Sequence, residues 1–371
     1  MIALGDPVLG EDEKRALCSV IDSNWITMGD RVAAFEQAFA ELHEAEAAVA
    51  VSSCTAGLHL SLKALGLGPG DEVLVPSLTF VATVNAILYV GATPVFVDIE
   101  NVDLPHMSLA DATTMCTPKT KAVLVMHYGG YIVDLPKWRS FADERQLLLI
   151  EDAAHAPGLD GVGKWSDAAV FSFFANKNMT TAEGGMVLAR DSSVRDHVRH
   201  MRAHGMTTGT LDRHRGHAYT YDVTMLGYNY RMDELRAALG LVQLSQLTKW
   251  NSRRRELKDY YRRSLAKLAP EIAIPFTQQH KTAAHLMPIL LGKDVDRGTF
   301  MQRLRNAGIQ CSIHYPPVHL FTYYQEHFPG SSLSQTEQFF NREVTLPLHA
   351  ALKETDIDSI VSAIQEAINT A

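Results

Sequence analysis

Short apolar runs alternate with amphipathic segments along the first half of this chain, and this alternation limits the possible folds more than any other feature. The apolar runs have the length and composition of buried strands. They lie at Ala48–Val51, Glu72–Val75, Pro94–Asp98, Ala122–His127, Leu147–Ile150, Ala168–Phe173 and Gly185–Ala189. Thr55–Leu65 and Val81–Val90, between the early runs, have helical spacing, and Val32–His43 is predicted to form a helix before the first strand. We therefore predict an α/β fold with a largely parallel, helix-covered sheet.

The pattern changes toward the C-terminus. A long helical stretch is predicted at Glu234–Leu247, followed by a second one at Trp250–Leu268. Short strands and two helices, around Asp296–Asn306 and Lys353–Asn369, are predicted after Pro270. Because 371 residues exceed what one hydrophobic core usually supports, we predict two domains. The large domain would comprise residues 1–245 and a small α+β domain residues 246–371, with the boundary inside a helical connection.

Charge and cysteine usage exclude several classes of protein. The net charge of −8 argues against non-specific binding of nucleic acid and against an anionic membrane surface. The cysteines are scattered and form no CxxC pair, so neither a disulfide framework nor a cysteine zinc site is expected. They are Cys18, Cys54, Cys116 and Cys311.

The remaining composition predicts a soluble protein without a metal. No apolar run reaches about 18 residues, and the first residues lack the basic and apolar regions of a signal peptide, so a cytoplasmic location is expected. The histidine pairs His200/His204 and His314/His319 lack both a third protein ligand and the adjacent glutamate of a zinc motif. No metal site is therefore predicted.

Polar residues follow three of the predicted strands where ligands usually bind. Asp152 follows Leu147–Ile150, and Ser172 closes Ala168–Phe173. The small-residue turn 53–57 follows Ala48–Val51 and opens a predicted helix. In parallel sheets, ligand sites lie beyond the carboxyl ends of the strands. Free backbone amides at a helix N-terminus bind anions, so we predict a phosphate site here.

Lys177 is the residue whose chemistry is most specific. It lies just beyond an apolar run, which is an unfavourable place for a hydrated ammonium group. The position is sensible if the amine is covalently engaged, for instance as a Schiff base with an aldehyde cofactor. Asp152 could then keep the ring nitrogen of pyridoxal phosphate protonated. Taken singly, the two residues could equally be a surface lysine and a helix-capping aspartate.

Further motifs in the same order make the pattern specific. They are Asn24–Gly29 with Phe35-Glu36, Ser53–Leu58, Gly70–Val73, Gly91–Asp98, Glu151–Ala156, Ser172 with Lys177, Glu183–Gly185, Gly227–Met232, His314-Tyr315 and Leu346–Leu348. With these motifs the chain resembles, nearly end to end, the DegT/DnrJ/EryC1/StrS family of sugar aminotransferases. The resemblance implies the fold type I (aspartate aminotransferase-like) architecture and pyridoxal 5'-phosphate (or its aminated form, pyridoxamine phosphate) as cofactor.

The resemblance also implies roles for individual residues. Lys177 would form the Schiff base and shuttle a proton, and Asp152 would pair with the pyridinium nitrogen. Phe80 would stack on the cofactor ring.

The phosphate and the subunit interface form a second group of implied contacts. The backbone amides of Thr55 and Ala56, with the Ser172 hydroxyl, would hold the phosphate. Asn229 would reach the phosphate of the neighbouring subunit, which implies a homodimer with shared active sites.

One position departs from the common family pattern. His155 stands where many members have a glutamine that contacts the phenolic oxygen of the cofactor. The branch resembling the aminotransferase that makes UDP-4-amino-4-deoxy-L-arabinose also has histidine there. The chain differs from that branch at Asn229-Tyr230-Arg231, so the substrate does not transfer with the motif.

The resemblance predicts transfer of an amino group from L-glutamate to a nucleotide-linked keto sugar, with a 4-keto sugar preferred. Alternatives are an aminotransferase for a ketocyclitol of the scyllo-inosose type in antibiotic biosynthesis, a sugar dehydratase and a non-catalytic cofactor-binding regulator. The dehydratases have histidine in place of Lys177, which counts against the second alternative. The sugar-nucleotide pocket is expected among 25–29, 202–222 and 314–319. The candidate substrate contacts within or near these segments are Trp25, Thr27, Met28, Arg231, His314 and Tyr315.

Overall fold

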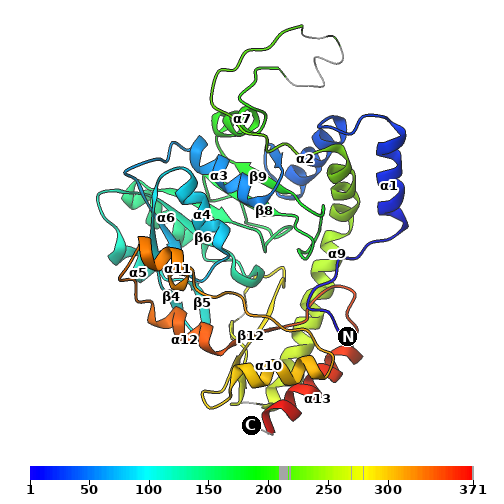
Figure 1. Cartoon of the computed structure of the whole chain (residues 1–371), viewed down its shortest axis with the longest axis vertical. Coiled ribbons are helices and arrows are strands. Elements are labelled where there is room, and N and C mark those ends of the chain that lie inside the picture. The colour runs from blue at the N-terminus through cyan, green and yellow to red at the C-terminus, as the bar shows by residue number, and fades with distance from the viewer. Residues whose placement is uncertain (209–215, 217–218, 269, 279, 370–371) are drawn as a thin grey trace.

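A seven-stranded sheet forms the centre of the molecule (Figure 1). The structure is a computed structural model that describes residues 1–208, 216, 219–268, 270–278 and 280–369. The strand order in the sheet is β1-β9-β8-β7-β6-β2-β3. Their bounds are β1 Ala48–Val51, β2 Glu72–Pro76, β3 Thr93–Val97, β6 Thr120–Met126, β7 Leu148–Asp152, β8 Ala168–Ser172 and β9 Gly185–Ala189. All seven predicted strands are therefore present.

The pairing confirms the predicted, largely parallel sheet and adds one exception. Five adjacent strands pair with one another in parallel, in the order β8, β7, β6, β2 and β3. β9 instead runs antiparallel to both β1 and β8. The chain enters β9 from the loop that follows β8, and an antiparallel partner can be reached without a crossover helix. β9 thereby separates β1 from the parallel strands.

Helices cover both faces of this sheet. The side chains of β1 alternate: Val49 and Val51 pack with α3 and α4, whereas Ala48 and Ala50 pack with α2 and α9. Another cluster packs α6 against β6 and β7 through Trp138. The bounds of these helices are α2 Asp30–Leu42, α3 Cys54–Ala64, α4 Val81–Tyr89, α6 Leu135–Arg145 and α9 Glu234–Leu265.

α9 connects the two parts of the chain. The two predicted segments form one continuous helix, because no glycine or proline interrupts the chain between Leu247 and Trp250. The helix contacts α1 (Glu11–Asp22) and α2 beside the large sheet and α13 (Glu354–Asn369) beside the smaller one (Figure 1). The predicted domain boundary at residue 245 falls inside α9 and stays a prediction.

The C-terminal part is built on a three-stranded antiparallel sheet. It consists of β10 (Ile272–Ala273), β11 (Met287–Leu291) and β12 (Glu343–Leu346). α10 (Arg297–Asn306) and α13 share a hydrophobic cluster with the C-terminal end of α9. The other helices and strands are β4 Ile99–Asn101, β5 Leu104–Met107, α5 Leu109–Met115, η1 Tyr128–Gly130, α7 Ser192–Met201, η2 Ala266–Leu268, η3 Val318–Leu320, α11 Thr322–His327 and α12 Ser334–Arg342.

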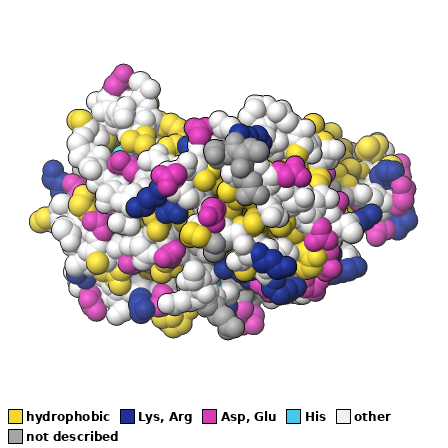
Figure 2. All heavy atoms as spheres, turned by 90° about the horizontal axis from the view of Figure 1, so that it is seen from below, with side chains coloured by type: hydrophobic (Ala, Val, Ile, Leu, Met, Phe, Trp, Pro, Cys, Tyr) yellow, Lys and Arg dark blue, Asp and Glu magenta, His cyan; other side chains and the backbone are white. Residues whose placement is uncertain are grey.

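The surface carries charges of both signs. On the face seen in Figure 2, acidic and basic side chains are interspersed with isolated apolar ones. Among the helices in the described part of the chain, none combines the length and apolar character needed to cross a bilayer.

Candidate active site

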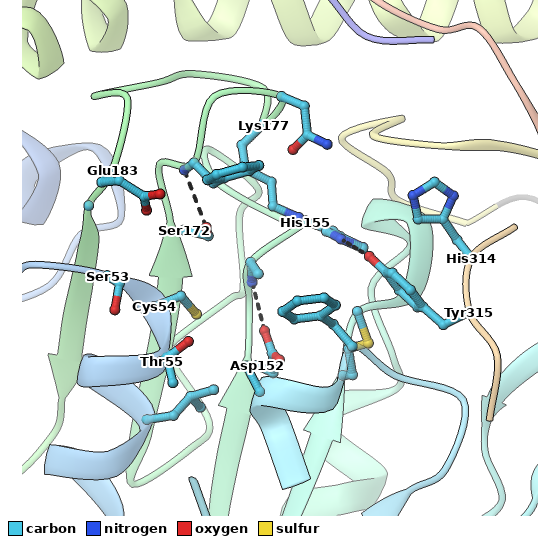
Figure 3. A pocket seen from close by; sticks show the side chains of 18 residues that line it. Ser53, Cys54, Thr55, Asp152, His155, Ser172, Lys177, Glu183, His314 and Tyr315 are labelled. Atoms are coloured by element: carbon cyan, nitrogen blue, oxygen red, sulfur yellow. Dashed lines mark hydrogen bonds between the residues drawn. The ribbon is translucent and has the colours of Figure 1, made fainter. Parts of the chain in front are cut away.

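A cavity of about 330 Å³ lies at the carboxyl ends of β1, β7 and β8. The loop after β8 contributes Lys177, and the C-terminal part of the chain contributes His314 and Tyr315 (Figure 3). The side chains around it come from segments far apart in the sequence. They are Ser53, Cys54, Thr55, Leu58, Phe80, Ala82, Met126, Asp152, Ala154, His155, Ser172, Phe174, Asn176, Lys177, Glu183, Gly184, His314 and Tyr315.

Asp152 forms the floor of the cavity. It is the last residue of β7, and its side chain is only 4% exposed. One carboxylate oxygen accepts a hydrogen bond from the Thr83 hydroxyl at 2.6 Å, and the other accepts one from the Ala154 amide at 3.0 Å. No helix begins at Asp152, so it is not a helix cap. These two hydrogen bonds fix the orientation of the carboxylate.

Lys177 enters the cavity from the opposite side (Figure 3). It lies in the turn after β8 and is half-buried, so it is not a free surface lysine. Burial lowers the pKa of its amine to about 8, although the nearby Asp152 and Cys54 act in the opposite direction. A larger share of this amine is therefore neutral and nucleophilic than for an ordinary lysine.

Buried histidines surround the Lys177 amine without adding charge. His155 is 1% exposed, and its Nε2 lies 3.0 Å from the Tyr315 hydroxyl. The ring of His155 lies 4.2 Å from that of His285, centroid to centroid. Burial, and then the proximity of Lys177, holds the pKa of His155 well below its usual value. His155 is therefore neutral, and its Nδ1 has no hydrogen-bond partner among the described residues.

The N-terminus of α3 forms one wall of the cavity. Ser53 caps this helix, because its hydroxyl accepts a hydrogen bond from the Ala56 amide at 3.1 Å. The amides of Cys54 and Thr55 lie in the first helical turn, where the helix itself supplies no acceptor. Ser172, at the end of β8, faces the same space. This wall thus offers backbone amides and a hydroxyl to an anion.

The backbone of β9 closely supports this wall. A Cβ atom on Gly185 would lie 2.6 Å from the carbonyl carbon of Ser53 and 2.7 Å from the amide nitrogen of Cys54. Only glycine allows the two backbones to approach this closely. Gly185 therefore lets β9 approach the turn at the start of α3.

Phe80 covers the cavity on the side of α4. It is the N-cap residue of that helix, and its side chain is 54% exposed. Its ring lies 5.9 Å from that of Tyr315. Both aromatic side chains line the cavity, and such a lining suits a flat heterocyclic ring.

Several predicted site residues lie outside this cavity. Ala56 does not line it, and its amide already donates to Ser53. Asn229 is exposed on the surface of the chain. The residues of the predicted substrate pocket that likewise lie outside are Trp25, Thr27, Met28 and Arg231. Of the predicted substrate contacts, the structure places His314 and Tyr315 at the cavity.

The loop at residues 25–29 is held by a residue that the sequence did not single out. The buried carboxylate of Glu234 accepts hydrogen bonds from the amides of Gly29, Arg31 and Val32 at 2.9–3.0 Å. Glu234 thereby anchors the start of α2. In the sequence Glu234 is simply the first residue of a predicted helix, which gives no sign of this contact.

The predicted segment 202–222 is described in part. Residues 209–215 and 217–218 lie outside the described residues. Arg202 forms a buried ion pair with Glu36, so it supports the fold and does not face the cavity.

Other cavity residues were not predicted as functional. Cys54 and Glu183 line the cavity, and Thr83 contacts Asp152 from the first turn of α4. The one available sequence signal for Thr83 was its place as a polar residue near the start of the helix that follows Phe80. Among the residues that the structure describes, no group of three or more histidine, cysteine or acidic side chains could hold a metal ion.

The cavity fits pyridoxal phosphate in its chemistry. Lys177 supplies a buried amine of lowered pKa, and Asp152 supplies a fixed carboxylate on the opposite side. The N-terminus of α3 and Ser172 offer donors for a phosphate, and the Gly185 backbone leaves room for this turn. These three features correspond to the aldehyde, the ring nitrogen and the phosphate of the cofactor.

Solved structures with the same fold include aminotransferases. PseC from Helicobacter pylori, an aminotransferase of pseudaminic acid biosynthesis, superposes with a TM-score of 0.94 at 28% identity, covering 100% of each chain. The sugar aminotransferase CalS13 from Micromonospora echinospora has a TM-score of 0.89 at 29% identity, covering 99% of this chain and 100% of its own. NtdA from Bacillus subtilis, solved with bound cofactor PMP, has a TM-score of 0.88 at 28% identity, covering 96% of this chain and 81% of its own.

The sequence matches a family model over almost its whole length. The model describes the DegT/DnrJ/EryC1/StrS aminotransferase family and matches residues 7–365. This agrees with the α/β fold, with the buried amine of Lys177 and with the fixed carboxylate of Asp152. The chain therefore belongs to the DegT/DnrJ/EryC1/StrS aminotransferase family.

Proposed function

We propose that this enzyme uses pyridoxal phosphate to move an amino group from L-glutamate to a keto group of a nucleotide-linked sugar. The single observation that carries the proposal is the placement of Lys177 and Asp152 on opposite sides of one cavity (Figure 3). Similar structures include a sugar aminotransferase, which supports a sugar as the amino acceptor. A 4-keto sugar is the preferred acceptor within this proposal.

Each residue of the cavity has a defined task in this reaction. When bound, pyridoxal phosphate supplies an electron sink for the pair that remains when the substrate carbon loses its proton. Lys177 Nζ would accept that proton and later return it, because its lowered pKa places it near the operating pH. The Asp152 carboxylate, held by Thr83, would stabilise positive charge on the ring nitrogen.

The remaining residues would bind and orient. The Thr55 amide at the start of α3 and the Ser172 hydroxyl would hold the phosphate, and the Ala56 amide would join them by giving up its hydrogen bond to Ser53. Phe80 would cover the ring face and exclude water. His155, which is neutral and has a free Nδ1, would face the phenolic oxygen of the cofactor.

A homodimer with shared active sites is part of the same proposal. Asn229 is exposed and lies outside the cavity of its own chain, which is what a contact to the neighbouring subunit requires. Trp25, Thr27, Met28 and Arg231 also lie outside that cavity, and they could contact the sugar of the neighbouring subunit in the same way.

The cytoplasm is the proposed location. The four cysteines are free thiols in the structure, as expected for a reducing compartment. The likeness to the UDP-4-amino-4-deoxy-L-arabinose branch, based on His155, stays a prediction.

The deciding experiment is amino transfer from glutamate to a panel of keto substrates. The panel comprises UDP-, dTDP- and GDP-linked keto sugars and one ketocyclitol, with 2-oxoglutarate formation as the readout. We expect turnover with at least one nucleotide-linked sugar. Turnover with the ketocyclitol alone would replace the proposed substrate class, and cofactor binding without any turnover would contradict the proposed reaction.

A further inference from the structure

A buried carboxylate and a buried hydroxyl lie directly behind His314. Because side chains alternate along a strand, Glu343 and Thr345 share one face of β12, while Val344 and Leu346 enter the hydrophobic cluster on the other. Glu343 is completely buried and Thr345 is 1% exposed. Neither residue lines the cavity.

Hydrogen bonds connect these two residues to His314 in a row. One carboxylate oxygen of Glu343 accepts the backbone amide of His314 at 2.9 Å. The other carboxylate oxygen is hydrogen-bonded to the Thr345 hydroxyl. The Thr345 hydroxyl oxygen lies 2.9 Å from Nδ1 of His314. Nε2 of His314 forms no hydrogen bond with a described residue, and His314 lines the cavity.

The ring of His314 is neutral, so only one of its nitrogens carries a proton. Burial, and then Lys177, lowers its pKa to about 4. A neutral imidazole has one donor and one acceptor. Whichever role Nδ1 takes toward Thr345, Nε2 must take the other role toward the cavity.

The hydroxyl of Thr345 has one proton and can donate to one neighbour at a time. If the Glu343 carboxyl is ionised, Thr345 donates to it and accepts from Nδ1–H, which leaves Nε2 as an acceptor. If Glu343 is protonated, its proton lies on the oxygen that faces Thr345, because the other oxygen already accepts the His314 amide. Thr345 then donates to Nδ1, and Nε2–H becomes a donor.

We propose that Glu343 and Thr345 form a hydrogen-bond relay that sets which ring nitrogen of His314 carries the proton. Through it, Nε2, the ring nitrogen that does not contact Thr345, either donates to a carbonyl or carboxylate oxygen of the substrate or accepts from a hydroxyl. Glu343 and Thr345 are positioning residues, and the inference rests on the proposed function in one respect, namely that the substrate reaches His314.

The surroundings of Glu343 favour the protonated form at neutral pH. Burial raises the pKa of its carboxyl to about 8, although the hydrogen bonds from Thr345 and His314 and the charge of Arg297 act against this. The other titratable groups near Glu343 are Tyr128, Tyr315 and Cys311. Below this pH the relay makes Nε2 a donor, and above it an acceptor.

The tautomer can be measured without any assumption about turnover. Nitrogen-15 spectra of the holoenzyme with labelled histidine distinguish protonated from unprotonated ring nitrogens, and His314→Gln identifies the resonances of His314. In the wild type we expect the proton to move from Nε2 to Nδ1 as the pH rises through about 8. In Glu343→Gln the amide NH₂ can only donate to Thr345, so the proton should stay on Nε2 at every pH.

Three further variants keep the test decisive. Thr345→Val removes the hydroxyl at similar volume and should abolish the pH-dependent change of tautomer, whereas Thr345→Ser should restore it. Glu326→Gln, at an exposed position, makes the same change of charge and should behave like the wild type. An unchanged tautomer and pH response in Glu343→Gln, or in Thr345→Val, would overturn the relay.

Kinetics then connect the relay to substrate binding. From pH 7 to 9 the KM for the keto sugar should rise about tenfold more in the wild type than in Glu343→Gln, because only the wild type loses a donor to the sugar oxygen. Lys177 titrates in the same range, so the comparison is between the two proteins and not within one pH profile. A parallel rise in both would overturn the relay. Absence of turnover with all sugars would instead contradict the proposed function and leave the spectra to decide on the relay.

Discussion

The Thr83 hydroxyl donates a hydrogen bond to Asp152 across 2.6 Å, and this contact fixes the carboxylate at the floor of the cavity. Thr83 lies in the first turn of α4, three residues after Phe80. Its oxygen also lies 2.8 Å from the Thr79 hydroxyl. One short segment therefore positions both the Asp152 carboxylate and the Phe80 side chain at the cavity.

Thr83→Val should lower kcat/KM for transamination roughly 10- to 100-fold. The substitution keeps the volume but removes a hydrogen bond to a charged group, worth about 1.5–3 kcal/mol. Steady-state kinetics with glutamate and the cofactor dissociation constant measure the effect. Thr83→Ser retains the hydroxyl and should remain close to the wild type; equal losses in both variants would assign the effect to packing.

Lys177→Ala should lower the rate of transamination at least about a thousand-fold, because the group that transfers the proton is lost. Borohydride treatment should attach the cofactor covalently to the wild-type chain but not to this variant, as mass spectrometry can establish. Lys14→Ala, at an exposed position of α1, is the matched control and should retain activity. Covalent attachment that persists without Lys177 would refute its assignment.

The cofactor-free enzyme should combine with pyridoxal phosphate faster as the pH rises toward 8. Burial lowers the pKa of Lys177 to about 8, and the neutral amine is the nucleophile. The rate should therefore increase about tenfold per pH unit below this value and become constant above it. Stopped-flow absorbance measures the rate. A rate that keeps increasing up to pH 10 would mean that the amine has an ordinary pKa.

Gly185→Ala should weaken the binding of the cofactor phosphate. The added Cβ would lie 2.6 Å from Ser53 and 2.7 Å from Cys54, both backbone atoms that cannot rotate away. The turn at the start of α3 must shift, so the dissociation constant of the cofactor should rise at least about tenfold. Gly68→Ala is the control, because the nearest atom to its Cβ would be 3.9 Å away.

Glu234→Ala should reduce the free energy of unfolding by about 2–4 kcal/mol, because three backbone amides lose their buried, charged acceptor. Urea denaturation monitored by circular dichroism measures the loss. Glu234→Gln still offers one amide oxygen and should lose less than the alanine variant. Equal stability of all three proteins would show that the start of α2 does not depend on this carboxylate.

Much of this architecture follows from local sequence patterns. The apolar runs predict all seven strands of the large sheet, because buried strands need continuous apolar residues. The direction of β9 was not predictable, since pairing direction depends on how the chain returns after Ser172. Lys177 stood out because a charged group follows a strand whose side chains are buried.

The supporting residues of the site leave no such local pattern. Thr83 and Asp152 are 69 positions apart, and His314 and Thr345 are 31 positions apart. Polar contacts between distant segments depend on the packing of the whole chain, and a threonine in a helix or strand looks ordinary in the sequence. The same reason explains why Glu234 was interpreted only as part of a helix.

The position of β9 between β1 and β8 has a consequence for synthesis on the ribosome. β1 lies at the edge of the large sheet, and β9 is its one strand neighbour among the described residues. The N-terminal strand is thus made early but cannot join the sheet until residue 189 has left the exit tunnel. The turn directly after β1, which we propose to bind the phosphate, is therefore completed only after more than half of the 371 residues have been translated.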